Sequence, residues 1–214
     1  MFRRVNKQQL LFYAITNHTW LNGSSLYEVV EESLKGGVTC LQLREKTLDA
    51  ERFSEEAQQL KPLCRSYGVP FIVNDNVDIA LASDADGVHI GQSDGDIAET
   101  RARIGNKILG VSASTVKEAL EAERAGADYL GVGAVFPTNS KNDAENVSLS
   151  TLRDICNSVS IPVVAIGGIT LENFSLLTDS GICGIAVISA IYAQKDIQTA
   201  AERLKTKVER CFGN

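Results

Sequence analysis

Residues 108–133, ILGVSASTVKEALEAERAGADYLGVG, contain one complete copy of the pattern from which the fold class follows. An apolar run at 108–111 precedes a segment, 116–125, in which apolar residues recur at helical spacing, and a second apolar run follows at 129–132. Gly126 stands between helix and strand, where glycine commonly ends a helix. This order predicts two parallel strands joined by a helix.

The same unit recurs along the whole chain. Apolar runs that predict buried parallel strands lie at residues 10–15, 38–43, 71–73, 87–90, 108–111, 129–132, 163–166 and 184–188. Asp49 and Thr170 are expected to cap the helices behind the second and seventh runs. Eight units in 214 residues, about 27 residues each, predict a single-domain (β/α)8 TIM barrel over residues 1–214.

An open, doubly wound parallel sheet is the alternative architecture. Such folds often carry a G-x-G-x-x-G turn after the first strand. The corresponding residues here are Thr16, Asn17, His18 and Thr19, which contain no glycine. The closed barrel is therefore favoured.

Composition restricts the classes of partner. The chain has 21 Lys and Arg against 27 Asp and Glu, a net charge of -6, which argues against nucleic acid as a partner. No apolar stretch approaches the ~20 residues of a membrane span. Five scattered cysteines without a C-x-x-C pair, and no signal peptide, predict reduced thiols and a cytoplasmic location.

Polar residues at the end of the second strand are the first candidates for a site. In an extended chain Gln42, Arg44 and Lys46 alternate onto one face, which would direct an amide and two cations into the mouth of the barrel. An anion with several oxygens is the natural ligand for this set. The alternative is that both cations only pair with Glu45 or with other neighbouring acids.

Two carboxylates follow the next strands. Asn74 and Asp75 end the third strand, and Asp94 follows the fourth. Two carboxylates near phosphate-binding cations suit a Mg²⁺ ion that bridges protein and substrate. The alternative is that each aspartate is the N-cap of the helix that follows it.

The later strands suggest a second anion site. Ser112 follows the fifth strand, Thr138 to Lys141 follow the sixth, and a glycine pair ending in Gly168 follows the seventh. In many barrels a phosphate is bound by backbone amides of the loops after strands seven and eight. The glycines after strand seven, together with Ile188 and Ser189 after strand eight, resemble such a site. A charged site with metal suits a diphosphate, and an amide site suits a monophosphate. Together they predict an enzyme that joins two small phosphorylated molecules and releases diphosphate.

These motifs, in this order, resemble those of the thiamine phosphate synthase family. The resemblance covers residues 10–210 and rests on the segments QLREK (42–46), VND (73–75), DGVHIGQSD (86–94), GVS (110–112), GADYLGVG (126–133), FPT (136–138), AIGGI (165–169) and VISAI (187–191).

The resemblance implies a transferase of thiamine biosynthesis. It would condense hydroxymethylpyrimidine diphosphate with a thiazole phosphate, or its carboxylated form with loss of carbon dioxide, by a dissociative mechanism that Mg²⁺ assists. The residues it implies for the pyrimidine diphosphate are Gln42, Leu43, Arg44, Glu45, Lys46, Asn74, Ser112 and Lys141, of which Arg44, Lys46, Ser112 and Lys141 would be catalytic. Those implied for the thiazole phosphate are Thr138, Asn139, Ser140, Gly168, Ile188 and Ser189, with Asp75 and Asp94 as Mg²⁺ ligands.

Two other functions are the alternatives. The related thiazole tautomerase has a histidine two residues after the serine of the fifth strand, where this chain has Ser114. A non-catalytic binder of thiamine phosphate would have lost a metal ligand or Lys141. Here Asp75, Asp94 and Lys141 are all present. His89, inside an apolar run, is interpreted as a structural core residue.

Overall fold

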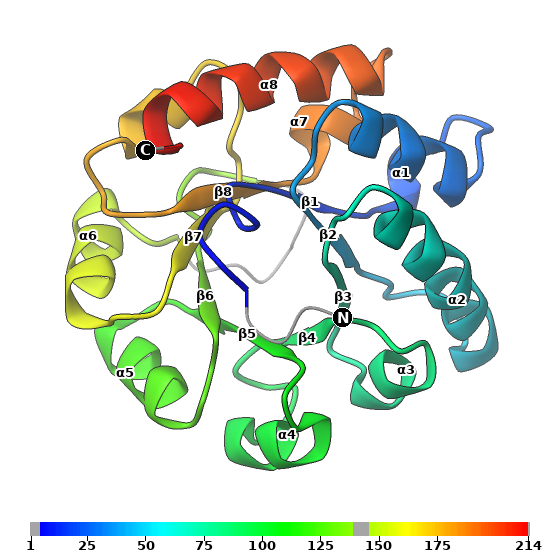
Figure 1. Cartoon of the computed structure of the whole chain (residues 1–214). Helices are drawn as coiled ribbons and strands as arrows, with labels where there is room; N and C mark the ends of the chain where they lie inside the picture. The colour runs from blue at the N-terminus through cyan, green and yellow to red at the C-terminus, as the bar shows by residue number, and fades with distance from the viewer. Residues whose placement is uncertain (1–4, 139–145, 214) are drawn as a thin grey trace.

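The structure is a computed structural model that describes residues 5–138 and 146–213. Eight parallel strands form a closed barrel in which each strand pairs with its sequence neighbours and β1 also pairs with β8 (Figure 1). The strands are β1 (Phe12–Ile15), β2 (Cys40–Leu43), β3 (Phe71–Asn74), β4 (Gly87–Ile90), β5 (Ile108–Ala113), β6 (Tyr129–Val132), β7 (Val163–Ile166) and β8 (Gly184–Val187). The predicted (β/α)8 barrel is confirmed, and because the sheet closes on itself the open-sheet alternative is wrong.

Helices surround the barrel (Figure 1). They are η1 (His18–Trp20), α1 (Leu26–Lys35), α2 (Ala50–Ser66), α3 (Val77–Ala82), α4 (Ile97–Ile104), α5 (Val116–Arg124), α6 (Leu149–Ser158), η2 (Phe174–Leu177), α7 (Ser189–Tyr192) and α8 (Ile197–Phe212), where η marks a 3-10 helix. Within residues 5–138 and 146–213, none of them has the length and apolar character needed to cross a bilayer.

The buried side chains form two layers. The larger layer lies between the strands and the helices, and includes Leu41, Leu43 and Val73. The smaller layer includes Tyr13, Ile72 and Tyr129. Side chains of a strand alternate between its two faces, so the smaller layer fills the inside of the barrel.

The expected caps are right at one helix and wrong at another. Asp49 caps α2, where its side chain accepts a hydrogen bond from the Arg52 N–H at 2.9 Å. The helix that follows β7 is the short η2, and Thr170 does not cap it. The Thr170 N–H donates a hydrogen bond to the Asn173 side chain. Gly167 and Gly168, both at positive φ, turn the chain after β7 in a conformation that no helix contains.

Two aspartates join neighbouring strands at the start of β4 and β6. Asp86 Oδ2 accepts the Phe71 N–H of β3 at 2.9 Å and lies 2.7 Å from Lys61 Nζ of α2. Asp128 Oδ2 accepts the Leu109 N–H of β5 at 2.8 Å and lies 2.6 Å from an Arg101 nitrogen. Each carboxylate therefore links two strands to a helix.

Candidate active site

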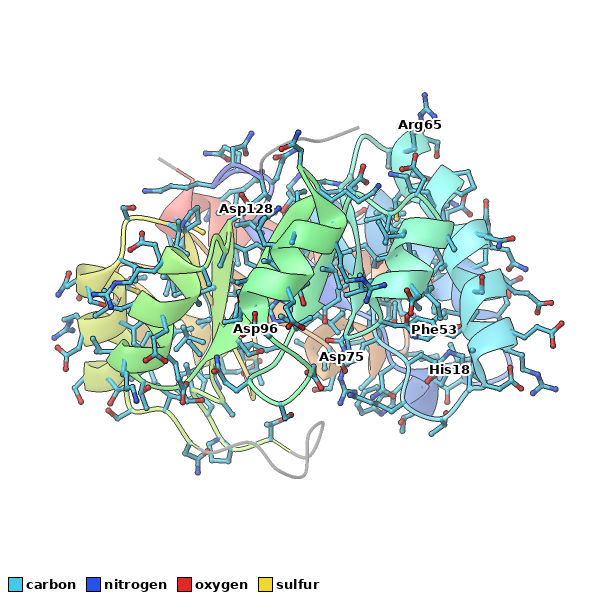
Figure 2. All side chains as sticks on the ribbon, turned by 90° about the horizontal axis from the view of Figure 1, so that it is seen from below. His18, Phe53, Arg65, Asp75, Asp96 and Asp128 are labelled. Atoms are coloured by element: carbon cyan, nitrogen blue, oxygen red, sulfur yellow. The ribbon has the colours of Figure 1, made fainter. Side chains whose placement is uncertain are left out.

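The carboxyl ends of the strands lie at one end of the barrel, which carries the active site in enzymes of this fold. Figure 2 shows Asp75 and His18 toward that end, with Asp128 and Arg65 toward the other. Asp75 directly follows β3, whereas Asp128 precedes β6, in agreement with this view. The predicted site residues that the structure describes lie among the last two residues of a strand, or follow a strand, at the Asp75 end.

Lys46, Asp75 and Asp94 form a charged group there. Lys46 Nζ lies 2.5 Å from Asp75 Oδ2. Burial raises the pKa of Asp75, Lys46 opposes this rise, and the neighbouring Asp94 carboxylate adds to it. Asp94 Oδ2 also accepts the Gly91 N–H at 2.8 Å, and a Cβ at Gly91 would lie only 2.7 Å from this oxygen. The structure thus brings together the two carboxylates that the sequence assigned to Mg²⁺.

The alternative that these aspartates are N-caps is wrong. Asn76 caps α3 by accepting the Ile79 N–H at 3.0 Å, and Asp96 caps α4 by accepting the Glu99 N–H at 2.8 Å. Asp75 instead adopts a φ of 61°, and its N–H donates to the His89 carbonyl at 2.8 Å. Its carboxylate therefore has no part in starting a helix and is directed toward Lys46 and Asp94.

A chain of hydrogen bonds crosses the interior of the barrel below this group. Gln42 Nε2 donates to the Tyr13 hydroxyl at 2.9 Å, which lies 2.8 Å from the Tyr129 hydroxyl. The Tyr129 hydroxyl lies 3.0 Å from His89 Nδ1, and His89 Nε2 lies 3.0 Å from Ser112 Oγ. Gln42 and Ser112, two predicted substrate-binding residues, are thus connected through three buried side chains.

The donors in this chain can be ordered in one consistent direction. The Gln42 amide nitrogen only donates, so the Tyr13 oxygen accepts and its hydrogen is available for Tyr129. Burial raises the pKa of both tyrosines, which keeps the hydroxyls protonated. If Tyr129 in turn donates to Nδ1, His89 carries its hydrogen on Nε2 and donates to Ser112.

Glycines make room for this chain. A Cβ at Gly110 would lie 2.2 Å from the Tyr129 ring and 2.4 Å from His89 Nδ1, closer than any side-chain carbon can approach. A Cβ at Gly131 would lie 3.1 Å from His89 Cε1. The glycines of the GVS and GADYLGVG motifs therefore admit an imidazole into the barrel, where it is buried as expected of a core residue and contacts a predicted site residue.

Tyr13 and Tyr129, which connect Gln42 to His89, are not among the residues that the sequence predicts for the site. A signal was present, since each is a tyrosine within an apolar run and a buried tyrosine hydroxyl needs a hydrogen-bond partner. Their partners could not be identified, because they lie 116 positions apart in the chain.

The remaining residues of the QLREK segment divide between core and surface. The Leu43 side chain is fully buried in the layer between strands and helices, so only its backbone is available to a ligand. Arg44 is half-buried, and within the described residues its guanidinium has no side-chain or ion-pair partner. Glu45 contacts His18 rather than pairing with Arg44, and Lys46 pairs with Asp75. Asn74 is buried at the end of β3, beside His89 of β4.

The loops after β6 and β7 pack against each other. The Phe136 N–H donates to the Gly167 carbonyl at 3.1 Å. Gly168 has a φ of 63°, and a Cβ there would lie 2.4 Å from the Pro137 carbonyl oxygen. Only glycine fits this contact, so the glycine pair brings its backbone against the segment that leads into Thr138.

The loop after β8 supplies the rest of this region. Ile188 precedes α7, which begins at Ser189 with no side chain capping its first turn. Thr138 is half-buried at the end of the described segment. The predicted residues Asn139, Ser140 and Lys141 lie outside the described residues.

Comparison with known proteins gives a consistent result. A family model described as thiamine monophosphate synthase matches residues 12–191. The chain is 52% identical over 200 residues to the thiamine-phosphate synthase of Ruminiclostridium cellulolyticum, covering 93% of this chain and 95% of that protein. It is 50% identical over 201 residues to the thiamine-phosphate synthase of Methanobrevibacter smithii, covering 94% and 96%.

Solved structures agree in fold. The thiamine phosphate pyrophosphorylase of Pyrococcus furiosus superposes with a TM-score of 0.90 at 43% identity, covering 97% of this chain and 99% of that one. A structure titled KGPDC from Streptococcus mutans has a TM-score of 0.70 at 15% identity, a likeness of fold alone.

Proposed function

Because this chain belongs to the thiamine monophosphate synthase family and is a transferase, we propose that it joins hydroxymethylpyrimidine diphosphate to a thiazole phosphate and releases diphosphate. The observation that carries this proposal is the grouping of Lys46, Asp75 and Asp94 at the carboxyl end of the barrel, where Gln42, Asn74 and Ser112 also lie. A diphosphate is an anion that such a group, with a metal, can neutralise.

The residues at Asp75 fit a Mg²⁺ ion. Two carboxylates lie against each other, where burial raises the pKa of Asp75, Asp94 raises it further and Lys46 opposes the rise. Carboxylate oxygens are the ligands that Mg²⁺ takes, together with phosphate oxygens and water. When bound, Mg²⁺ would supply charge neutralisation to the leaving diphosphate.

The reaction we propose is dissociative. The bond between the pyrimidine methylene and the diphosphate oxygen breaks, and the electron pair leaves with the diphosphate. The thiazole nitrogen then forms the new bond to the methylene. A carboxylated thiazole also loses carbon dioxide, and the electron pair left on the thiazole takes up a proton from water. Ionisation needs no general base, so the work of the protein is to stabilise the departing charge and to align the nitrogen.

Individual side chains would divide this work. Arg44, Lys46 and Lys141 would neutralise the diphosphate, and Ser112 would hold it through its hydroxyl. Ser112 Oγ lies 3.0 Å from His89 Nε2, so its position is set from inside the barrel. Gln42 and Asn74 would bind the pyrimidine side of the substrate.

The thiazole phosphate would bind where the loops after β6, β7 and β8 meet. Supporting this placement, the Gly168 backbone contacts the Pro137 carbonyl so closely that no side chain could stand there. Thr138, Ser140 and Ser189 would add hydroxyl donors, with Asn139 beside them and Ile188 lining the site. Backbone amides suit a monophosphate, because they bind it without an added cation.

A cytoplasmic location belongs to the same proposal. All five cysteines are free, and Cys40, Cys64 and Cys183 are buried, as expected for a protein of a reducing compartment.

The test supplies both substrates with Mg²⁺ and follows thiamine phosphate formation. We expect product with the unaltered chain, and a loss of at least about a hundredfold in turnover for Asp75→Ala and for Lys141→Ala. Circular dichroism of both variants serves as the control for folding. Unchanged turnover in both would refute the site, and absence of product from the unaltered chain would refute the function.

A further inference from the structure

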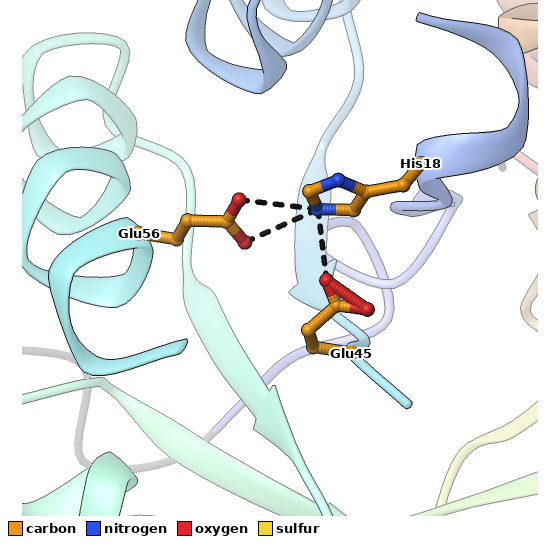
Figure 3. A group of neighbouring side chains, drawn as sticks. All are labelled: His18, Glu45 and Glu56. Carbon is orange, nitrogen blue, oxygen red and sulfur yellow. Dashed lines mark hydrogen bonds and ion pairs between the residues drawn. The ribbon is translucent and has the colours of Figure 1, made fainter. Parts of the chain in front are cut away.

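Three side chains from separate elements converge beside the QLREK segment (Figure 3). His18 belongs to η1, Glu45 follows β2, and Glu56 lies on α2. His18 Nε2 lies 2.9 Å from Glu45 Oε2, and 3.1 Å and 3.2 Å from the two carboxylate oxygens of Glu56. One imidazole nitrogen therefore faces three carboxylate oxygens.

A single nitrogen cannot satisfy these oxygens with hydrogen bonds. His18 Nε2 carries at most one hydrogen, and its hydrogen-bond geometry is met toward Glu56. Glu45 Oε2 is left with no hydrogen-bond partner among the described residues, although its side chain is only 5% exposed. A buried carboxylate oxygen without a partner is costly, and this one is directed at the imidazole nitrogen.

The charge of the cluster is also unbalanced. Glu45 and Glu56 contribute two carboxylates, and no lysine or arginine forms an ion pair with either of them within residues 5–138 and 146–213. Burial raises the pKa of Glu56 in spite of His18 beside it. A bound cation would remove both the charge excess and the orphaned oxygen.

We propose that His18, Glu45 and Glu56 bind a divalent transition-metal ion, with Zn²⁺ as the representative of the class. One imidazole and two carboxylates are a ligand set that suits Zn²⁺ and its neighbours. Ligands at about 2.1 Å from a metal lie about 3.0–3.4 Å from one another, depending on geometry. The observed nitrogen–oxygen separations of 2.9–3.2 Å need only small adjustments to meet this range.

This site differs from the Asp75 and Asp94 pair in chemistry and in position. A set made only of carboxylates suits Mg²⁺, whereas an imidazole selects a softer ion. Glu45 lies between Arg44 and Lys46 in the chain, so the ion would fix the segment that carries both cations to η1 and α2.

The test is a calorimetric titration of the full chain with Zn²⁺, with Mg²⁺ in excess so that the Asp75 and Asp94 pair is saturated. We expect one Zn²⁺ per chain, and at least a tenfold loss of affinity in His18→Ala and in Glu56→Gln. Glu55→Gln is the matched control, because Glu55 is an exposed neighbour of Glu56 on α2, and its affinity should equal that of the unaltered chain.

A second readout uses Co²⁺ in place of Zn²⁺. Bound Co²⁺ should give a visible absorption spectrum that His18→Ala changes and Glu55→Gln does not. The proposal is overturned if no Zn²⁺ binds, or if His18→Ala and Glu56→Gln bind it as tightly as the unaltered chain. Neither readout depends on turnover, so failure of the metal site and failure of the proposed function can be distinguished.

Discussion

At the scale of single residues, the Tyr129 hydroxyl connects the two halves of the barrel interior. It contacts Tyr13 at 2.8 Å on one side and His89 at 3.0 Å on the other. The strand-end positions of Gln42 and Ser112 followed from the pattern of apolar runs. Their connection through Tyr129 did not, because it depends on how a closed barrel brings distant strands into contact.

We predict that Tyr129→Phe raises the KM for the pyrimidine diphosphate, because His89 loses the partner that orients it toward Ser112. Its free energy of unfolding should fall by about 1–2 kcal/mol for the lost hydrogen bonds. Steady-state kinetics and urea unfolding measure the two effects.

Tyr192→Phe is the matched control. The Tyr192 hydroxyl is also buried, but it lies 3.2 Å from Ser33 Oγ of α1 rather than inside the barrel. The variant should lose about 1 kcal/mol of stability, for one hydrogen bond, and keep its KM. Equal changes of KM in both variants would contradict a positioning role for Tyr129.

Cysteine reactivity provides a second prediction at this scale. Burial raises the pKa of Cys156 to about 11 and that of Cys183 to about 12, whereas Cys211 is exposed. At pH 8 a thiol of pKa 11 is about one part in a thousand thiolate, the reactive form.

Alkylation followed by mass spectrometry should therefore modify Cys211 first. Cys156 labelling should accelerate as pH rises from 8 toward 11, since deprotonation increases toward its pKa. Labelling of Cys183 ahead of Cys211 in the folded protein would contradict this order.

At the scale of elements, the positions of the strands depend on local sequence, whereas the turns between them also depend on contacts with distant loops. The strand positions could be predicted because each apolar run is local and is buried on both faces. The helix expected behind β7 was wrong, because the glycine pair turns the chain toward the loop after β6. Asn76 and Asp96, not Asp75 and Asp94, cap their helices, a difference of one or two positions that local propensity does not resolve.

We predict that Asp86→Ala lowers the free energy of unfolding by about 3 kcal/mol, because it leaves Lys61 and the Phe71 N–H without their shared partner. Urea unfolding followed by circular dichroism measures the loss.

Asp78→Ala is the comparison variant. Asp78 is also paired, with Arg103, but its side chain is 84% exposed. Water screens such a pair, so the loss should stay below about 1 kcal/mol. If the two variants lost equal stability, the carboxylate of Asp86 would not be what holds β3, β4 and α2 together.

At the scale of the whole molecule, closure of the barrel gathers loops that lie far apart in the sequence. It places the carboxylates after β3 and β4 at the same end as the glycine turn after β7 and the start of α7. The net charge of -6 is a total over the whole chain, so it does not prevent a few cations from serving one local site. This arrangement suits the reaction between two small phosphorylated molecules that we propose.

The most direct measurement supplies both substrates and quantifies diphosphate and thiamine phosphate as Mg²⁺ is removed by a chelator and then restored. We expect equimolar products with Mg²⁺, loss of both products when Mg²⁺ is chelated, and recovery when Mg²⁺ is added back. Absence of product with Mg²⁺ present, or an unchanged rate in the chelator, would contradict it.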